Sequence, residues 1–68
     1  MLSYKPLWKT MKKQNITTYA LINTYNINSR TINNLKHNKS ITMYTLERLC
    51  CILHCKPNDI VEFLETKI

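Results

Sequence analysis

The side chains best equipped to recognise another molecule follow one another between positions 29 and 34. The guanidinium of Arg30 can donate two hydrogen bonds to one guanine, and the amides of Asn33 and Asn34 can each pair with the exposed edge of an adenine. Ser29, at the start of this stretch, can donate or accept a hydrogen bond. Each two-bond contact discriminates between bases by about 1–3 kcal/mol. We therefore expect these four side chains to contact base edges in duplex DNA.

Basic charge is concentrated in the same part of the chain. Residues 1–40 contain seven lysines and arginines and no acidic residue, whereas residues 41–68 contain three basic and four acidic residues. The first part therefore forms a positive surface, and nucleic acid is the commonest polyanionic partner of such a surface. Charge alone is also compatible with a solvated surface that binds nothing, and the same alternative applies to Asn33 and Asn34.

Four lysines are suited to contact DNA phosphates, which fix the position of a protein on the duplex without carrying sequence information. These lysines are Lys36, Lys39, Lys12 and Lys13. The backbone N–H groups that follow Thr17 and Thr42, at the starts of two expected helices, can add to such contacts. Lys12 and Lys13 have a second explanation, because lysines at the end of a helix also interact favourably with its dipole.

The cysteines do not have the spacing of a metal site. Structural zinc sites use paired cysteine spacings, whereas Cys50, Cys51 and Cys55 crowd into six residues without that pairing. His54 and His37 do not complete such a set. Cys50 is also in register with the leucines around it, so we expect it in the core. We expect neither a metal nor any other cofactor.

No group of residues supports catalysis either. The chain has four acidic residues, no glycine and therefore no glycine-rich loop, and no nucleophile beside an organised base. We therefore expect a binding protein and not an enzyme.

Helical periodicity predicts the elements that position these groups. Apolar residues recur at intervals of three and four in five segments, which predicts an all-α, five-helix domain spanning residues 1–68. The expected helices cover about 4–13, 18–25, 29–36, 43–53 and 57–65. Their expected N-caps, for the first four helices, are Ser3, Thr17, Asn28 and Thr42. No segment alternates with a period of two, so we predict no sheet.

The ends of these helices carry further signals. Asn26 and Asn38 stand where a left-handed residue is needed, a conformation that asparagine tolerates better than most residues. Pro57 suits the first turn of the fifth helix. The residues that this helix should turn towards the core are Ile60, Val61 and Leu64.

A regular pattern of residues runs from Ile16 to Leu35. It consists of Ile16, Thr17, Thr18, Leu21, Ile22, Asn26, Ile27, Asn28, Ile32 and Leu35. A later set consists of Thr42, Leu46, Leu49, Cys50, Leu53, Cys55, Pro57, Asp59 and Ile60. In both sets the chain resembles the lambda-repressor-like helix-turn-helix family, also called the xenobiotic-response-element type, which includes Cro repressors. The resemblance covers nearly the whole chain.

The resemblance implies a helix-turn-helix unit at about 17–36, whose second helix, about 29–36, enters the major groove of double-stranded DNA. It also implies a transcriptional regulator, more often a repressor than an activator. Such a regulator acts as a homodimer on half-sites about one helical turn apart. Thr18 and Asn28, at the starts of the two helices, are then further phosphate contacts.

Four positions depart from the family pattern. Thr18 replaces the usual glutamine, Ile22 the usual alanine, and Asn26 and Asn38 the usual glycines. The asparagines preserve the backbone conformation at some cost in strain, and Ile22 demands more room between the second and third helices. Thr18 is the change that matters for function, because its shorter side chain keeps at best a phosphate contact.

Other features concern location and self-association. The chain has no run of roughly 18 apolar residues and no apolar leader, so we expect a cytoplasmic protein with no membrane partner. Trp8 and the tyrosines recur at helical spacing and are expected in the core, not stacked on bases. A second copy of the chain is an expected partner, because Ile52, Phe63 and Ile68 fall outside the inward-facing stripes.

One alternative function uses the same fold. A protein-interaction module, such as an antitoxin-like adaptor, would use the basic surface to cover an acidic protein partner. Salt and sequence dependence separate the two, because a DNA binder loses affinity steeply as salt rises and still prefers one sequence. The sequence does not identify a pocket for a small-molecule effector, so it makes no prediction about such an effector.

Overall fold

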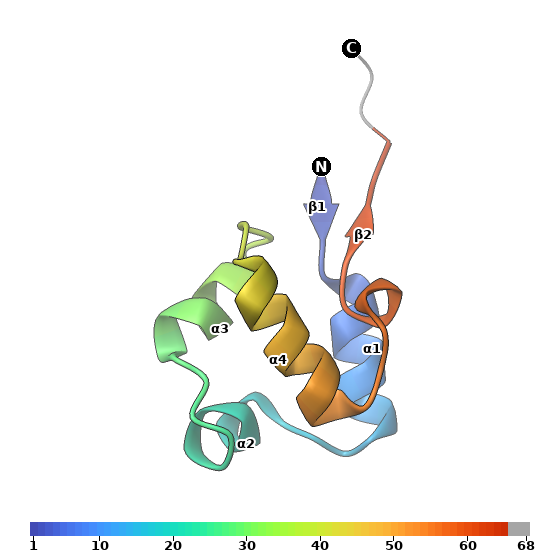
Figure 1. Cartoon of the computed structure of the whole chain (residues 1–68). Coiled ribbons are helices and arrows are strands. Elements are labelled where there is room, and N and C mark those ends of the chain that lie inside the picture. The colour runs from blue at the N-terminus through green and yellow to red at the C-terminus, as the bar shows by residue number, and fades with distance from the viewer. Residues whose placement is uncertain (66–68) are drawn as a thin grey trace.

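A computed structural model of the chain describes residues 1–65. Within that range, four α-helices and one 3₁₀ turn are joined by loops, and a two-stranded sheet joins the first residues to those after the 3₁₀ turn (Figure 1). The elements are β1 (Leu2–Ser3), α1 (Lys5–Lys13), α2 (Thr18–Asn23), α3 (Ser29–Lys36), α4 (Met43–Leu53), the 3₁₀ turn (Pro57–Asp59) and β2 (Glu62–Phe63). None of the described helices has the length and apolar character needed to cross a membrane.

One hydrophobic core holds the helices together. Each helix contributes a fully buried leucine. These are Leu7 in α1, Leu21 in α2, Leu35 in α3 and Leu49 in α4. Burying one such side chain stabilises the folded state by about 1.5–3 kcal/mol relative to leaving it in water. Because all four helices share this core, the orientation of α3 is tied to that of its neighbours.

The predicted N-caps of α2, α3 and α4 are confirmed. These caps are Thr17, Asn28 and Thr42, and in each the side-chain oxygen accepts a hydrogen bond of 2.7–3.1 Å from a first-turn N–H group. Such a cap typically contributes about 1 kcal/mol to stability. The expected cap of α1, Ser3, lies one residue too early, because Tyr4 occupies the cap position.

Four residues in the described range adopt the left-handed conformation without being glycine. Asn26 and Asn38 do so as predicted, with φ of 58° and 55°. Asn15 and His54, with φ of 57° and 50°, were not predicted. His54 ends α4 and donates its backbone N–H to the carbonyl of Cys50. The left-handed conformation costs an L-residue about 1–2 kcal/mol, and histidine lacks the short polar side chain that eases it for asparagine.

The predicted fifth helix is wrong. Pro57 opens a single 3₁₀ turn that ends at Asp59, and β2 follows. A hydrogen bond holds the two ends of this turn together, because the carboxylate of Asp59 accepts from the N–H of Lys56 at 3.2 Å. Ile60 is fully buried as predicted, but Leu64, expected to face the core, is 45% exposed. The fold is therefore a four-helix domain in place of the expected five.

The prediction of no sheet is also wrong. β1 pairs with β2 in antiparallel register, with Leu2 opposite Phe63 and Ser3 opposite Glu62. The hydroxyl of Ser3 donates to Oε2 of Glu62 at 3.1 Å, across 59 residues of chain. Each strand has two residues, which is too short to show an alternating pattern. A pairing between segments so distant in sequence is invisible to local periodicity.

Replacing His54 with glycine should stabilise the protein. Glycine adopts the left-handed conformation without steric cost, and this gain should exceed the backbone entropy that glycine loses on folding. We expect about 0.5–1 kcal/mol of added stability. For a domain of this size that corresponds to a melting temperature higher by about 2–8 °C.

The matched control is Glu47→Gly, in the exposed middle of α4. Glycine is unfavourable inside a helix, so this variant should melt at a lower temperature than the unmodified chain. Thermal melts followed by circular dichroism compare the two. A decrease for both variants would show that His54 is not strained.

Candidate nucleic-acid interface

α3 buries one side and exposes the other. Ile32 and Leu35 lie in the core. Successive residues of an α-helix are rotated by about 100°, so Arg30, Asn33 and Asn34 lie on the opposite side of α3. Arg30 and Asn33 are exposed, and Asn34 is half-buried. The three side chains expected to pair with guanine and adenine therefore share one polar side, which carries no acidic residue.

Other polar residues extend this side at both ends of α3. Ser29 is exposed in the first turn, and Asn28 uses its side-chain oxygen to cap the helix by accepting from the N–H of Arg30. His37 directly follows the helix, and its Nδ1 lies 2.8 Å from the carbonyl oxygen of Asn33. The sequence already carries a signal for this position, because a spacing of seven residues from Arg30 places His37 on the same helix side.

The turn between α2 and α3 is held by backbone hydrogen bonds and by one arginine. α2 ends at Asn23, two residues earlier than predicted, because the N–H groups of Thr24 and Tyr25 both donate to the carbonyl of Ala20. Arg48 of α4 donates from Nη2 to the carbonyl oxygen of Tyr25 at 2.8 Å. This bond fastens the turn to α4. Sequence periodicity carries no signal for it, since the acceptor is a backbone atom 23 residues away.

The loop between α3 and α4 is held by Tyr4. The Tyr4 hydroxyl donates to the carbonyl oxygen of Lys39 at 2.6 Å, and its backbone N–H donates to Oδ1 of Asn38 at 3.2 Å. Tyr4 is 1% exposed, and burial raises the pKa of its phenol above the usual 10.0. These bonds fix the backbone of the loop on which Lys39 is exposed.

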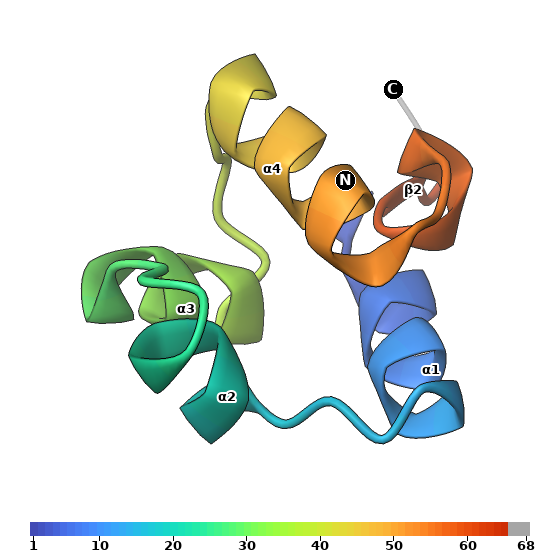
Figure 2. The same ribbon diagram turned by 60° about the horizontal axis from the view of Figure 1, so that its bottom comes forward.

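The candidate phosphate contacts fall into two groups. Thr18 and Lys36 line the same shallow hollow, and Lys39 follows α3 on the neighbouring loop. Lys12 and Lys13 end α1, whose C-terminal end lies across the molecule from α3 in both views (Figures 1 and 2). The structure thus gathers these three, together with the cap residue Asn28, around the α2–α3 pair and leaves the two lysines of α1 apart from it.

The cysteines lie around the C-terminal end of α4. Cys50 and Cys55 are half-buried and Cys51 is exposed. Burial raises the pKa of the Cys50 thiol, and burial also raises the pKa of Cys55, to about 11. The backbone N–H of Cys55 donates to the carbonyl of Cys50 at 3.0 Å. Within residues 1–65, no three His, Cys, Asp or Glu side chains are grouped so that they could hold a metal ion.

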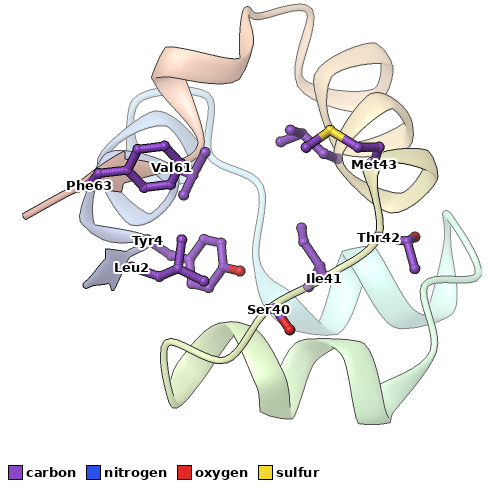
Figure 3. Close-up of a pocket in the computed structure, with 9 residues that line it drawn as sticks. Leu2, Tyr4, Ser40, Ile41, Thr42, Met43, Val61 and Phe63 are labelled. Carbon is purple, nitrogen blue, oxygen red and sulfur yellow. The ribbon is translucent and has the colours of Figure 1, made fainter.

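A separate apolar groove lies between the sheet and the start of α4 (Figure 3). Its walls include Leu2, Ile41, Leu46 and Val61, and none of its lining residues is charged. Met43 and Phe63 also line the groove and are 79% and 80% exposed. Of the other residues expected to meet a second copy, Ile52 is half-buried and Ile68 lies outside the described residues.

A protein family and a solved structure are similar to this chain. A family model described as the Cro/C1-type helix-turn-helix DNA-binding domain matches residues 6–65. The crystal structure of the transcriptional regulator VanUg is similar, with a TM-score of 0.87 and 26% sequence identity over 96% of this chain and 87% of that chain. No match is found among curated proteins.

The raised pKa of Tyr4 predicts a loss of stability at alkaline pH. Tyr4 stays protonated in the folded chain above the pH at which it ionises in the unfolded chain, near 10.0. Its contribution is therefore fully present below pH 10 and is lost as pH rises through the folded-state pKa. Tyr4→Phe should be about 1 kcal/mol less stable at neutral pH, because it lacks the hydrogen bond of the hydroxyl. Its free energy of unfolding should also depend less on pH above 10.

Urea unfolding at a series of pH values measures this difference. Tyr44→Phe is the matched control, because Tyr44 is 70% exposed and its replacement should leave the alkaline loss unchanged. Groups that all three proteins share cancel in the comparison. Parallel curves for Tyr4→Phe and the unmodified chain would contradict the assignment.

Proposed function

The chain belongs to the family of Cro/C1-type helix-turn-helix DNA-binding domains, and we propose that it is a transcriptional regulator that reads a specific duplex sequence with α3. The observation that carries this proposal is the polar side of α3, where Arg30, Asn33 and Asn34 point away from the core. The major groove of B-DNA admits one α-helix and presents a different donor and acceptor pattern for each base pair. We further propose repression as the outcome, because occupying a site is sufficient to block its use.

Four polar residues of α3 contact base edges in this proposal. Arg30 donates two hydrogen bonds to a guanine, and Asn33 and Asn34 pair with adenines. Ser29, nearest the start of the helix, donates to or accepts from a base edge. Because Asn34 is half-buried, it has less freedom to adapt than Arg30 and tolerates fewer bases at its position.

Phosphate contacts hold this helix in register. The contacts nearest to α3 come from Thr18, Asn28, Lys36 and Lys39. Lys12 and Lys13 are weaker candidates, because they lie at the far end of α1. Their charges contribute instead to the long-range attraction that steers the domain to DNA.

Arg30→Ala should relax the sequence preference of the protein. Selection on random duplexes first defines the preferred site, and fluorescence anisotropy then measures affinity for that site and for bulk DNA. Losing one two-bond base contact should weaken binding to the preferred site by about 5–150-fold while leaving bulk binding nearly unchanged. If Arg30→Ala kept the same preferred site, the proposed base contact of Arg30 would be contradicted.

Lys36→Ala tests the other kind of contact. It should weaken binding to all sequences alike and reduce the slope of log affinity against log salt by about 1. Lys56→Ala is the control, because Lys56 is exposed beside the 3₁₀ turn and should change neither quantity. Failure of the unmodified chain to bind any duplex at low salt would favour the adaptor function.

We also propose that two copies bind together, through the apolar groove between the sheet and α4. Two chains of net charge +6 repel one another, so their contact requires a surface without lysines. The groove meets that requirement, since its lining residues are uncharged and two of them, Met43 and Phe63, are largely exposed. An acidic protein would instead favour the lysine-rich surface. A pair of domains would place two α3 helices in half-sites about one helical turn apart.

Phe63→Glu should therefore abolish self-association, because it places a charge at the centre of an apolar contact. Sedimentation equilibrium at tens of micromolar protein measures this directly, both for the free chain and on an inverted-repeat duplex. Tyr19→Glu is the control for the free chain, since Tyr19 is 74% exposed but lines none of this groove. A chain that stays monomeric both free and on that duplex would contradict the proposal.

A further inference from the structure

Trp8 is the single tryptophan of the chain, and its side chain is less buried than expected. It packs against the core with part of its ring but remains half-buried. Its exposed part lines a shallow hollow together with Thr18 and Lys36. It also lines a second hollow, which includes Lys5 and Lys36. The two hollows adjoin, because Trp8 and Lys36 belong to both, and together they form what we call the Trp8 surface.

The indole N–H of Trp8 is available to an external acceptor. In the described part of the chain, no hydrogen bond engages this N–H, and no side-chain nitrogen or oxygen is both buried and without a partner. The N–H therefore reaches solvent. Indole nitrogen is a donor only, so it is suited to an oxygen that accepts.

The charge of the Trp8 surface favours an anion. Lys36 and Lys5 each contribute a positive charge, and Glu62 contributes one negative charge at the edge of the second hollow. The carboxylate of Glu62 is already engaged, because its Oε2 accepts a hydrogen bond from Ser3. The remaining donors are the indole N–H, the hydroxyl of Thr18, the side-chain amide of Asn38 and two ammonium groups. This donor set suits phosphate oxygens, which are acceptors and carry negative charge.

We propose that the Trp8 surface binds backbone phosphates of the duplex whose major groove receives α3. This inference rests on the proposed function, and it adds two contacts, Trp8 and Lys5, that the sequence did not indicate. Lys36 connects the two sites, because it belongs to α3 and also lines both hollows. The DNA backbone then runs from the start of α2, at Thr18, past the indole towards the start of α1.

The proposed site also accounts for the short side chain of Thr18. The hydroxyl of Thr18 sits on a short side chain, so it reaches only a small distance from α2. The indole and the ammonium of Lys36 border the same hollow and supply donors that extend beyond the hydroxyl. A phosphate held there limits rotation of α3 about its own axis, which helps to keep its polar side towards the bases.

The fluorescence of Trp8 gives a direct test. Because the chain has one tryptophan, a change of tryptophan emission on adding a duplex with the selected site comes from Trp8 alone. We expect the emission to change in proportion to the bound fraction measured independently by anisotropy. Inorganic phosphate at matched ionic strength should leave the emission unchanged, which separates a DNA backbone site from a site for the free ion.

Two variants test the contacts themselves. Trp8→Phe keeps an aromatic ring against the core and removes the N–H donor, so it should bind every duplex about tenfold more weakly with the same sequence preference. Lys5→Ala, at an exposed position that leaves the core intact, should reduce the salt slope by about 1. Lys56→Ala should behave as the unmodified chain.

The outcomes distinguish this inference from the proposed function. Normal binding and salt slope in both variants, together with a lost preference in Arg30→Ala, would overturn the Trp8 surface alone. Absence of binding to any duplex would overturn both. If Trp8→Phe does not fold, the salt slope of Lys5→Ala and the emission of Trp8 still decide the question.

Discussion

The burial of Ile32 and Leu35 is the constraint on which the interface depends. These two side chains anchor α3 in a core to which every helix contributes a fully buried leucine. A domain of this size buries a modest share of its surface, so each large apolar side chain is a substantial part of its stability. Rotating α3 by one residue would expose Leu35 or bury Arg30, and both changes are costly. The core therefore determines which side chains meet a partner.

Hydrogen bonds from distant side chains to the backbone complete this arrangement. Arg48 holds the turn before α3 through the carbonyl of Tyr25, and Tyr4 holds the loop after α3 through the carbonyl of Lys39. Both bonds act on segments that lack regular secondary structure. Together they fix the two ends of α3 as well as its buried side. A helix held in this way loses little further entropy on binding, which favours affinity.

The sequence predicts features that depend on near neighbours. The caps at Thr17, Asn28 and Thr42 and the left-handed Asn26 and Asn38 follow from local hydrogen bonding and steric tolerance, and the structure contains them. The exposed side of α3 follows from the 3.6-residue period of the α-helix.

The features that the sequence does not predict depend on distant partners. The expected last helix gives way to a 3₁₀ turn and a strand, because Glu62 and Phe63 pair with the start of the chain. The role of Arg48 has the same origin, since its acceptor is a carbonyl that any residue would supply. The ring of Trp8 is less buried than its helical spacing predicts, because periodicity identifies which residues face inward but not how completely a large ring is covered.

The pairing of β1 with β2 has a consequence for the order in which the domain assembles. It closes a loop of nearly sixty residues, from Ser3 to Glu62, and the entropy lost in closing a loop grows with its length. Two residues on each side cannot offset that loss by themselves, since even a longer isolated hairpin is marginally stable in water. The two-stranded sheet must therefore form late, on helices that have already packed together. Tyr4 directly follows β1 and occupies the cap position of α1, so it lies at the junction between the helices that pack early and the sheet that forms late.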